Sequence, residues 1–87
     1  MKRFWIKLDY SDYESIPIGT RMGIGVTATN LDDAKNQLLE KIFKRKQLPE
    51  IKNVVEDIDI NELDNNHVRP NMGNPAVYGI WFPLGYN

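Results

Sequence analysis

The sequence contains no cysteine, which excludes disulfide bonds, thiolate metal sites and cysteine nucleophiles. It also lacks an excess of positive charge, because 11 lysine and arginine residues stand against 12 aspartate and glutamate residues, for a net charge of −1. Dedicated nucleic-acid-binding proteins usually have a basic domain or face, so this balance argues against that class.

Long apolar runs are absent as well. The longest run, from Ala76 to Tyr86, is about half as long as a membrane span and is broken by glycine and proline. At the start of the chain, Lys7 and Asp9 interrupt the apolar stretch before the hydrophobic region of a signal peptide can form. We therefore expect no membrane segment and a cytoplasmic location.

The chain has 87 residues, 41% of them hydrophobic, which is enough for one small globular domain spanning residues 1–87. From Pro70 to Asn87 there is no charged side chain, although this stretch contains Trp81, Phe82 and two tyrosines. Because aromatic side chains gain the most free energy from burial, this end is predicted to pack in the core or against a partner.

Four segments have the composition and periodicity of β-strands. Phe4, Ile6 and Leu8 recur at a period of two, which predicts a strand over about residues 3–10. Further strands are predicted over about residues 23–29, 51–60 and 77–83, the last of them apolar on both faces. In the second strand, Gly23 and Gly25 share a face and would let another group approach the backbone closely.

A helix is predicted between the second and third strands, over about residues 31–46. Apolar residues recur there at spacings of three and four, from Leu31 to Phe43. Asp32 and Asp33 occupy the first turn, and basic residues crowd the last turns, as the helix dipole favours. Pro49 prevents the helix from continuing.

The predicted fold is α+β, a four-stranded, mainly antiparallel sheet with one helix packed on one face, in the order β-β-α-β-β. The helical crossover makes the second and third strands parallel to each other. One helix covers one face only, so the other, partly aromatic face is expected to bind a partner. The candidate contact residues on that face and its rim are Trp5, Trp81, Phe82, Tyr10 and Tyr13.

The only histidine lies in a polar loop, LDNNHVRPN, that is a candidate binding site. His67 could act as an acid or base, and Arg69 could bind a carboxylate or a phosphate. Asn71 and Asn74 could orient a ligand beside them. The same residue types are typical of any connecting loop, which is the alternative interpretation.

The first loop gathers three carboxylates and two tyrosines, namely Asp9, Tyr10, Asp12, Tyr13 and Glu14. These residues fit a solvated loop, recognition of a partner, or acid–base catalysis. No histidine or second carboxylate motif beside them completes a catalytic set. A catalytic function would therefore need a residue from elsewhere in the chain, with His67 the available candidate.

Three other patterns have a structural explanation. The segment Asp57–Asn61 begins like a calcium-binding loop, but the sixth and twelfth positions are Glu62 and Val68 instead of glycine and glutamate. The segment Gly23–Ala28 resembles a dinucleotide-binding fingerprint but lacks the strand that should precede it. A cluster of basic residues near the end of the predicted helix is explained by the helix dipole, which favours positive charge there. These are Lys41, Lys44, Arg45, Lys46 and Lys52. No metal and no cofactor is predicted, and nucleic-acid binding through the basic cluster is the weakest option.

The sequence thus favours a small non-catalytic binding module that associates with a protein partner, expected to be a second copy of itself in a homodimer. The alternative is a small enzyme or small-molecule binder that uses His67 and Arg69 with Asp9 or Asp12. A domain of this size usually needs a second subunit to close a pocket, so that site would lie at a subunit interface.

Overall fold

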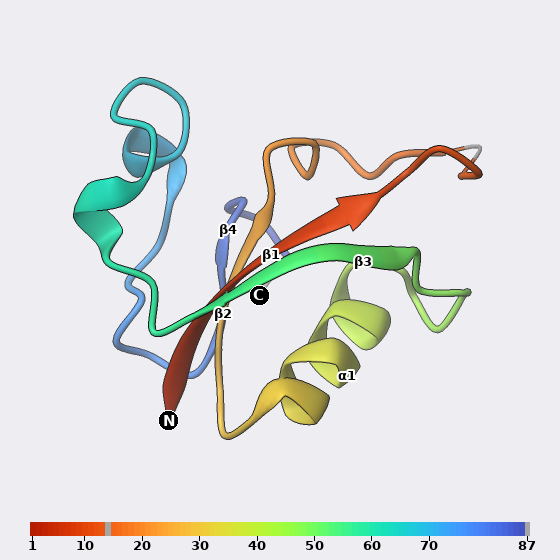
Figure 1. Cartoon of the computed structure of the whole chain (residues 1–87), viewed down its shortest axis with the longest axis horizontal. Coiled ribbons are helices and arrows are strands. Elements are labelled where there is room, and N and C mark those ends of the chain that lie inside the picture. The colour runs from red at the N-terminus through yellow and green to blue at the C-terminus, as the bar shows by residue number, and fades with distance from the viewer. Residues whose placement is uncertain (14, 87) are drawn as a thin grey trace.

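One four-stranded sheet and one helix form the framework of the computed structural model, which describes residues 1–13 and 15–86 (Figure 1). Two short 3-10 turns lie in the connection to the last strand. The elements are β1 (Lys2–Asp9), β2 (Ile24–Ala28), α1 (Leu31–Lys41), β3 (Glu50–Glu56), the turns Ile60–Glu62 and Arg69–Asn71, and β4 (Gly79–Phe82).

The strands lie in the order β3-β1-β2-β4, and every neighbouring pair is antiparallel. Because β1 is antiparallel to both β2 and β3, those two strands run parallel to each other, with β1 between them. The predicted α+β class, with one helix on a four-stranded sheet, is confirmed.

The first core lies between the sheet and α1. Phe4 and Ile6 of β1 are paired with Val26 and Ile24 of β2, and all four side chains are buried. The helix contributes the other wall of this core, in which Leu38 is fully buried. The period-two pattern of β1 therefore positions its even-numbered apolar residues toward the helix.

The third strand carries an extra residue opposite the Lys7–Leu8 step of β1, where the register shifts by one. Because of this bulge, Ile51 and Val54 both pack against the core on the helix side, although they are three positions apart. The strand ends at Glu56, so the prediction of a strand over 51–60 is wrong for its last residues. Asp57 has a φ of 55° and turns the chain out of the sheet.

The helix is also shorter than predicted, because it ends at Lys41 rather than near residue 46. Asn30 caps its start, where the side chain accepts a hydrogen bond of 2.9 Å from the Asp33 amide. Beyond the end of the helix, Lys44 and Arg45 have φ values of 52° and 65°, in the left-handed region. Phe43 is buried although it lies past the end of the helix. The apolar pattern therefore extends beyond the helix, which is why the sequence predicted a longer one.

The expectation that the second face of the sheet is uncovered is wrong. Figure 1 shows the connection between β3 and β4 on the side of the sheet away from α1. Apolar residues of this connection, among them Ile58, Leu63 and Val68, form a second core. Trp5, Trp81 and Phe82 are buried in it, with 6%, 2% and 4% of their surfaces exposed. The three expected contact residues of an aromatic interface are therefore core residues of the single chain.

Two glycines make room for this second core, as their shared face predicted. A β-carbon at Gly25 would lie 2.4 Å from the Trp81 ring, and one at Gly23 would lie 2.6 Å from the Trp5 ring. Both distances are far below van der Waals contact. The two indole rings therefore lie against bare backbone, and they also stack on each other with a centroid separation of 6.1 Å.

Candidate functional site

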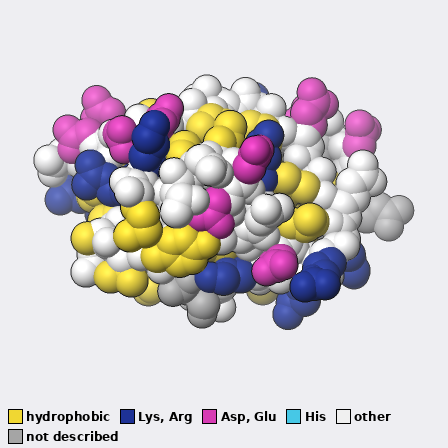
Figure 2. Space-filling model, turned by 90° about the horizontal axis from the view of Figure 1, so that it is seen from below, with side chains coloured by type: hydrophobic (Ala, Val, Ile, Leu, Met, Phe, Trp, Pro, Cys, Tyr) yellow, Lys and Arg dark blue, Asp and Glu magenta, His cyan; other side chains and the backbone are white. Residues whose placement is uncertain are grey.

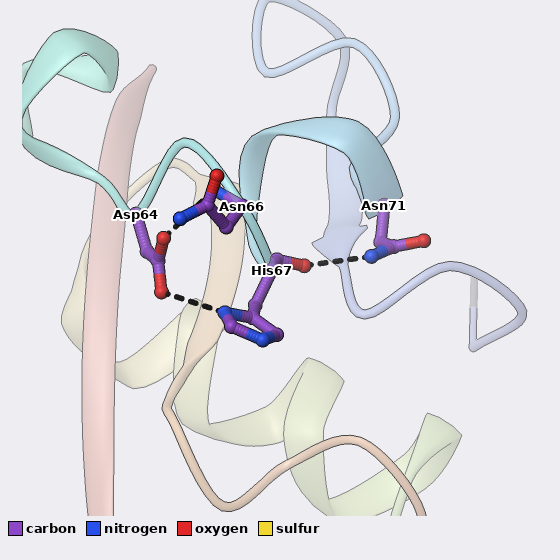
Figure 3. A network of polar contacts seen from close by, with 4 residues as sticks. All are labelled: Asp64, Asn66, His67 and Asn71. Carbon is purple, nitrogen blue, oxygen red and sulfur yellow. Dashed lines mark hydrogen bonds and ion pairs between the residues drawn. The ribbon is translucent and has the colours of Figure 1, made fainter.

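The loop around His67 is a network of short polar contacts (Figure 3). His67 Nδ1 lies 3.0 Å from Asp64 Oδ2, and the Asn66 amide donates a 2.8 Å hydrogen bond to Asp64 Oδ1. Asn71 Nδ2 donates a 2.7 Å hydrogen bond to the His67 carbonyl oxygen. These contacts fix the orientation of an imidazole ring that is mostly exposed to solvent.

The carboxylate that pairs with His67 is Asp64, and neither Asp9 nor Asp12. The Asn66 amide, and after it the His67 ring, lower the pKa of the Asp64 carboxyl below its ordinary value. Asp64 is therefore ionised at neutral pH and can orient the imidazole. A charged carboxylate beside a histidine ring is an arrangement that supports proton transfer or hydrogen bonding to a ligand.

The structure separates the four predicted site residues into two pairs. His67 and Asn71 line the same hollow on the surface. Arg69 instead donates a hydrogen bond to Asn65, and Asn74 Oδ1 accepts one of 2.9 Å from the Ala76 amide. Arg69 and Asn74 do not line the hollow, and their contacts stabilise the turns in which they lie.

The hollow that His67 and Asn71 line has a volume of about 570 Å³ and is formed by three segments of the chain. Its apolar walls are the loop segment Ile16–Ile18, Met22, and the segment Phe82–Leu84 that follows β4. Among the described residues of its lining, the charged or titratable side chains are those of Arg21 and His67. Its size is that of a pocket for a small ligand or for a few side chains of a partner.

The rim of this hollow exposes three large apolar side chains. Ile18 is 90% exposed, Leu84 is 59% exposed and Met22 is 41% exposed. Single exposed apolar residues are ordinary on protein surfaces, whereas several of them around one hollow make it a candidate binding surface. The interpretation of the first loop from the sequence rests on its carboxylates and tyrosines, so this surface was missed. The signal in the sequence was the presence of isoleucines and a methionine in a loop.

Other apolar side chains are exposed elsewhere on the molecule, among them Met1, Val77 and Tyr78. Figure 2 shows one face on which hydrophobic side chains lie among charged ones. The hollow that Met1 helps to line has a volume of only about 260 Å³ and is mainly polar. The surface around Ile18 differs because its exposed side chains surround a larger, mainly apolar hollow.

Hydrogen bonds hold the loop that presents Ile18. Tyr10 Oη donates a 2.6 Å hydrogen bond to Thr20 Oγ1, which donates one of 2.8 Å to the Pro17 carbonyl oxygen. Tyr86 Oη donates one of 2.8 Å to the Ile18 carbonyl oxygen. Burial of the Tyr10 ring raises the pKa of its hydroxyl, so the hydroxyl stays protonated as a donor at neutral pH. The main chain of the loop is thus held in place while the Ile18 side chain faces solvent.

The two tyrosines predicted at the rim of an interface both support this region. The rings of Tyr10 and Tyr13 pack edge to face at 5.9 Å, and Tyr13 packs in the same way on Phe43 at 5.7 Å. Tyr13 Oη also donates a hydrogen bond of 2.9 Å to the Gln47 carbonyl oxygen. Both rings join the first core at its edge, so they connect the loop to the segment that follows α1.

The described carboxylates of the first loop, Asp9 and Asp12, do not reach His67. Asp9 and Asp12 line a separate hollow of about 250 Å³, together with Tyr13 and residues 47–50. Asp9 accepts a hydrogen bond from the Ser11 amide, which lowers the pKa of its carboxyl. Glu14, the third predicted carboxylate, lies outside the described residues. Among the residues that the structure describes, no group of three histidine, aspartate or glutamate side chains is placed to hold a metal ion.

No protein family, curated protein or solved structure matches this chain. The geometry of the surface around Ile18 and His67 therefore carries the functional argument. Within residues 1–13 and 15–86, no helix combines the length and the apolar character that a membrane span requires.

Proposed function

We propose that the protein is a small binding module that docks a protein partner on the hollow around Ile18. The observation that carries the proposal is the group of three exposed apolar side chains, Ile18, Met22 and Leu84, on the rim of one hollow. Burial of such side chains in an interface contributes about 25 cal/mol for each Å² of apolar surface removed from water.

The way in which the loop is held supports a protein partner. Ile18 projects into solvent, while its carbonyl oxygen accepts a hydrogen bond from Tyr86. A protruding apolar side chain on a fixed backbone can be buried against a docked partner with little loss of conformational entropy. A loop free to move would lose part of this gain.

The expectation of a homodimer was based on an uncovered aromatic face. That face is buried within one chain, so it no longer supports a homodimer. A second copy remains one possible occupant of the surface around Ile18, and light scattering distinguishes it from other partners. The expected cytoplasmic location likewise stays a prediction.

A second candidate function is the binding of a small molecule in the same hollow. The observation that favours it is the presence of three polar side chains, those of Arg21, His67 and Asn71, in an otherwise largely apolar lining. His67 is oriented by Asp64, and its ring could bond to a polar group of a ligand. This candidate depends on the His67 ring, whereas docking of a protein partner depends on Ile18.

The test is a selection of peptides from a random display library on the immobilised full chain. We expect retained peptides to bind the wild-type chain and to be lost on Ile18→Asp, which places a charge on the exposed tip of the loop. The matched control is Val77→Asp, because Val77 is also exposed but does not line the hollow. The proposal would be contradicted if the peptides bind the wild type and both variants equally, or if no peptide is retained. A small-molecule site instead predicts that His67→Ala, and not Ile18→Asp, abolishes binding in a fragment screen.

A further inference from the structure

The hollow around Ile18 adjoins a second one, and the segment Ile16–Ile18 lines both. The second hollow has a volume of about 420 Å³, and its other walls come from the segment that follows α1 and from Tyr13, Ser15 and Tyr86. Ile42 and Phe43 form the apolar part of that wall. The exposed Ile18 side chain therefore lies on a ridge between two mainly apolar hollows.

Every charged side chain in the described lining of these two hollows is basic. Arg21 belongs to the first hollow, and Lys44 and Lys46 belong to the second. Within residues 1–13 and 15–86, none of these three residues forms an ion pair. By contrast, Arg45 pairs with Glu40. In a chain with a net charge of −1, this surface is a local concentration of unpaired positive charge.

The helix dipole alone does not explain this grouping. It favours basic residues in the last turn of α1, and Lys41 occupies that position. Lys46 lies beyond the turn in which Lys44 and Arg45 adopt left-handed φ values, and Arg21 comes from a different loop. The fold thus brings cations from two distant segments to the two sides of one apolar ridge.

We infer that the partner presents an acidic, apolar peptide segment, in which two apolar side chains are flanked by aspartate or glutamate residues. One apolar side chain would occupy each hollow on either side of Ile18, and the flanking carboxylates would lie beside Arg21, Lys44 and Lys46. This inference rests on the proposed function and adds the chemistry of the partner to it. The apolar contacts supply most of the affinity, while the exposed charges supply selectivity and a faster association rate.

In the experiment, we sequence the library peptides that bind the wild-type chain and do not bind the Ile18→Asp variant. We expect Asp and Glu to be enriched over Lys and Arg in these peptides, relative to the unselected library. For synthetic peptides from this set, Lys44→Glu combined with Lys46→Glu should lower the affinity roughly tenfold at low salt, with a smaller effect at high salt. The matched control is Lys7→Glu combined with Lys52→Glu, which makes the same change of charge outside both hollows.

The outcomes separate the inference from the proposed function. Peptides that depend on Ile18 but show no preference for acidic residues would overturn the inference and leave the binding module intact. An equal effect of the two double charge reversals would overturn it as well, because net charge alone would then explain the loss. If no retained peptide depends on Ile18, both proposals fail. Dimers in light scattering that Ile18→Asp dissociates would place a second copy on this surface and would also overturn the inference.

Discussion

Tyr86 Oη donates a 2.8 Å hydrogen bond to the carbonyl oxygen of Ile18, and so joins the last described residue of the chain to its most exposed large apolar side chain. The bond crosses 68 positions of sequence. It holds the backbone of the ridge between the two hollows, so the proposed docking surface is fixed before a partner arrives. Preorganisation of this kind lowers the entropic cost of binding.

Replacing Tyr86 with phenylalanine removes this bond and keeps the ring. Because the bond is exposed, we expect the free energy of unfolding to fall by at most about 1 kcal/mol. The amides of Ile18, Gly19 and Thr20 should exchange with solvent severalfold faster, and peptides selected on the wild-type chain should bind more weakly. Tyr78→Phe is the matched control, because Tyr78 bonds to Asp33, outside this loop. Equal exchange rates in both variants would show that the Tyr86 hydroxyl does not hold the loop.

The close approach of Trp81 to Gly25 predicts that a single methyl group there disrupts the second core. Gly25→Ala should lower the free energy of unfolding by about 1–3 kcal/mol, because the ring must move away from its packed position. Gly73→Ala is the control, since its nearest neighbour is at 3.6 Å, an ordinary contact, and it should cause no loss. Denaturant unfolding measures both changes. A Gly25→Ala protein as stable as the wild type would contradict the packing described for the tryptophans.

Coverage of the sheet by the connection between β3 and β4 predicts the behaviour of tryptophan fluorescence. Both tryptophans should resist acrylamide quenching in the folded chain, because they are almost fully buried. Leu63→Ala should cost about 2–4 kcal/mol and should make the emission redder and more quenchable, since Leu63 belongs to the same core. Leu84→Ala, which truncates an exposed side chain, should change neither property. Wild-type tryptophans that are freely quenched would restore the earlier prediction of an open aromatic face.

The elements with a clear period were predictable from the sequence, and the cover of the second face was not. β1 alternates at a period of two, and the start of α1 has a capping residue and acidic first turn. The apolar residues that cover the second face are Ile58, Leu63 and Val68, which repeat at neither the strand period nor the helix period. Each of these three residues lies in an irregular segment and packs in the same core as the tryptophans. A count of helices against strands therefore predicted a bare face that the chain itself covers.

The candidate site was predictable in part for the same reason. His67 and Asn71 were identified by residue type, and both line the hollow. Asp64, the partner of His67, was not identified. It lies only three positions before His67, and a local turn brings the two side chains together. The basic side chains near Ile18 come from segments that no local pattern connects. The sequence could show exposed isoleucine in a loop, but only the fold shows the cations beside it.

The contact between His67 and Asp64 predicts a specific change in a titration. The folded-state pKa of Asp64 is lowered from 3.8, chiefly by the Asn66 amide and then by His67. The stability from this group is therefore present above about pH 4 and is lost as the pH falls through the lower, folded-state pKa. His67→Ala removes only the second cause, so the pKa of Asp64 should rise part of the way toward 3.8. Carbon-13 NMR of the carboxyl groups measures it, and Asp33 is the internal control, because Thr29 and Tyr78 lower its pKa independently of His67. An Asp64 pKa that does not move in His67→Ala would show that the imidazole and the carboxylate do not interact, and the ring would then lack the orientation on which a small-molecule site depends.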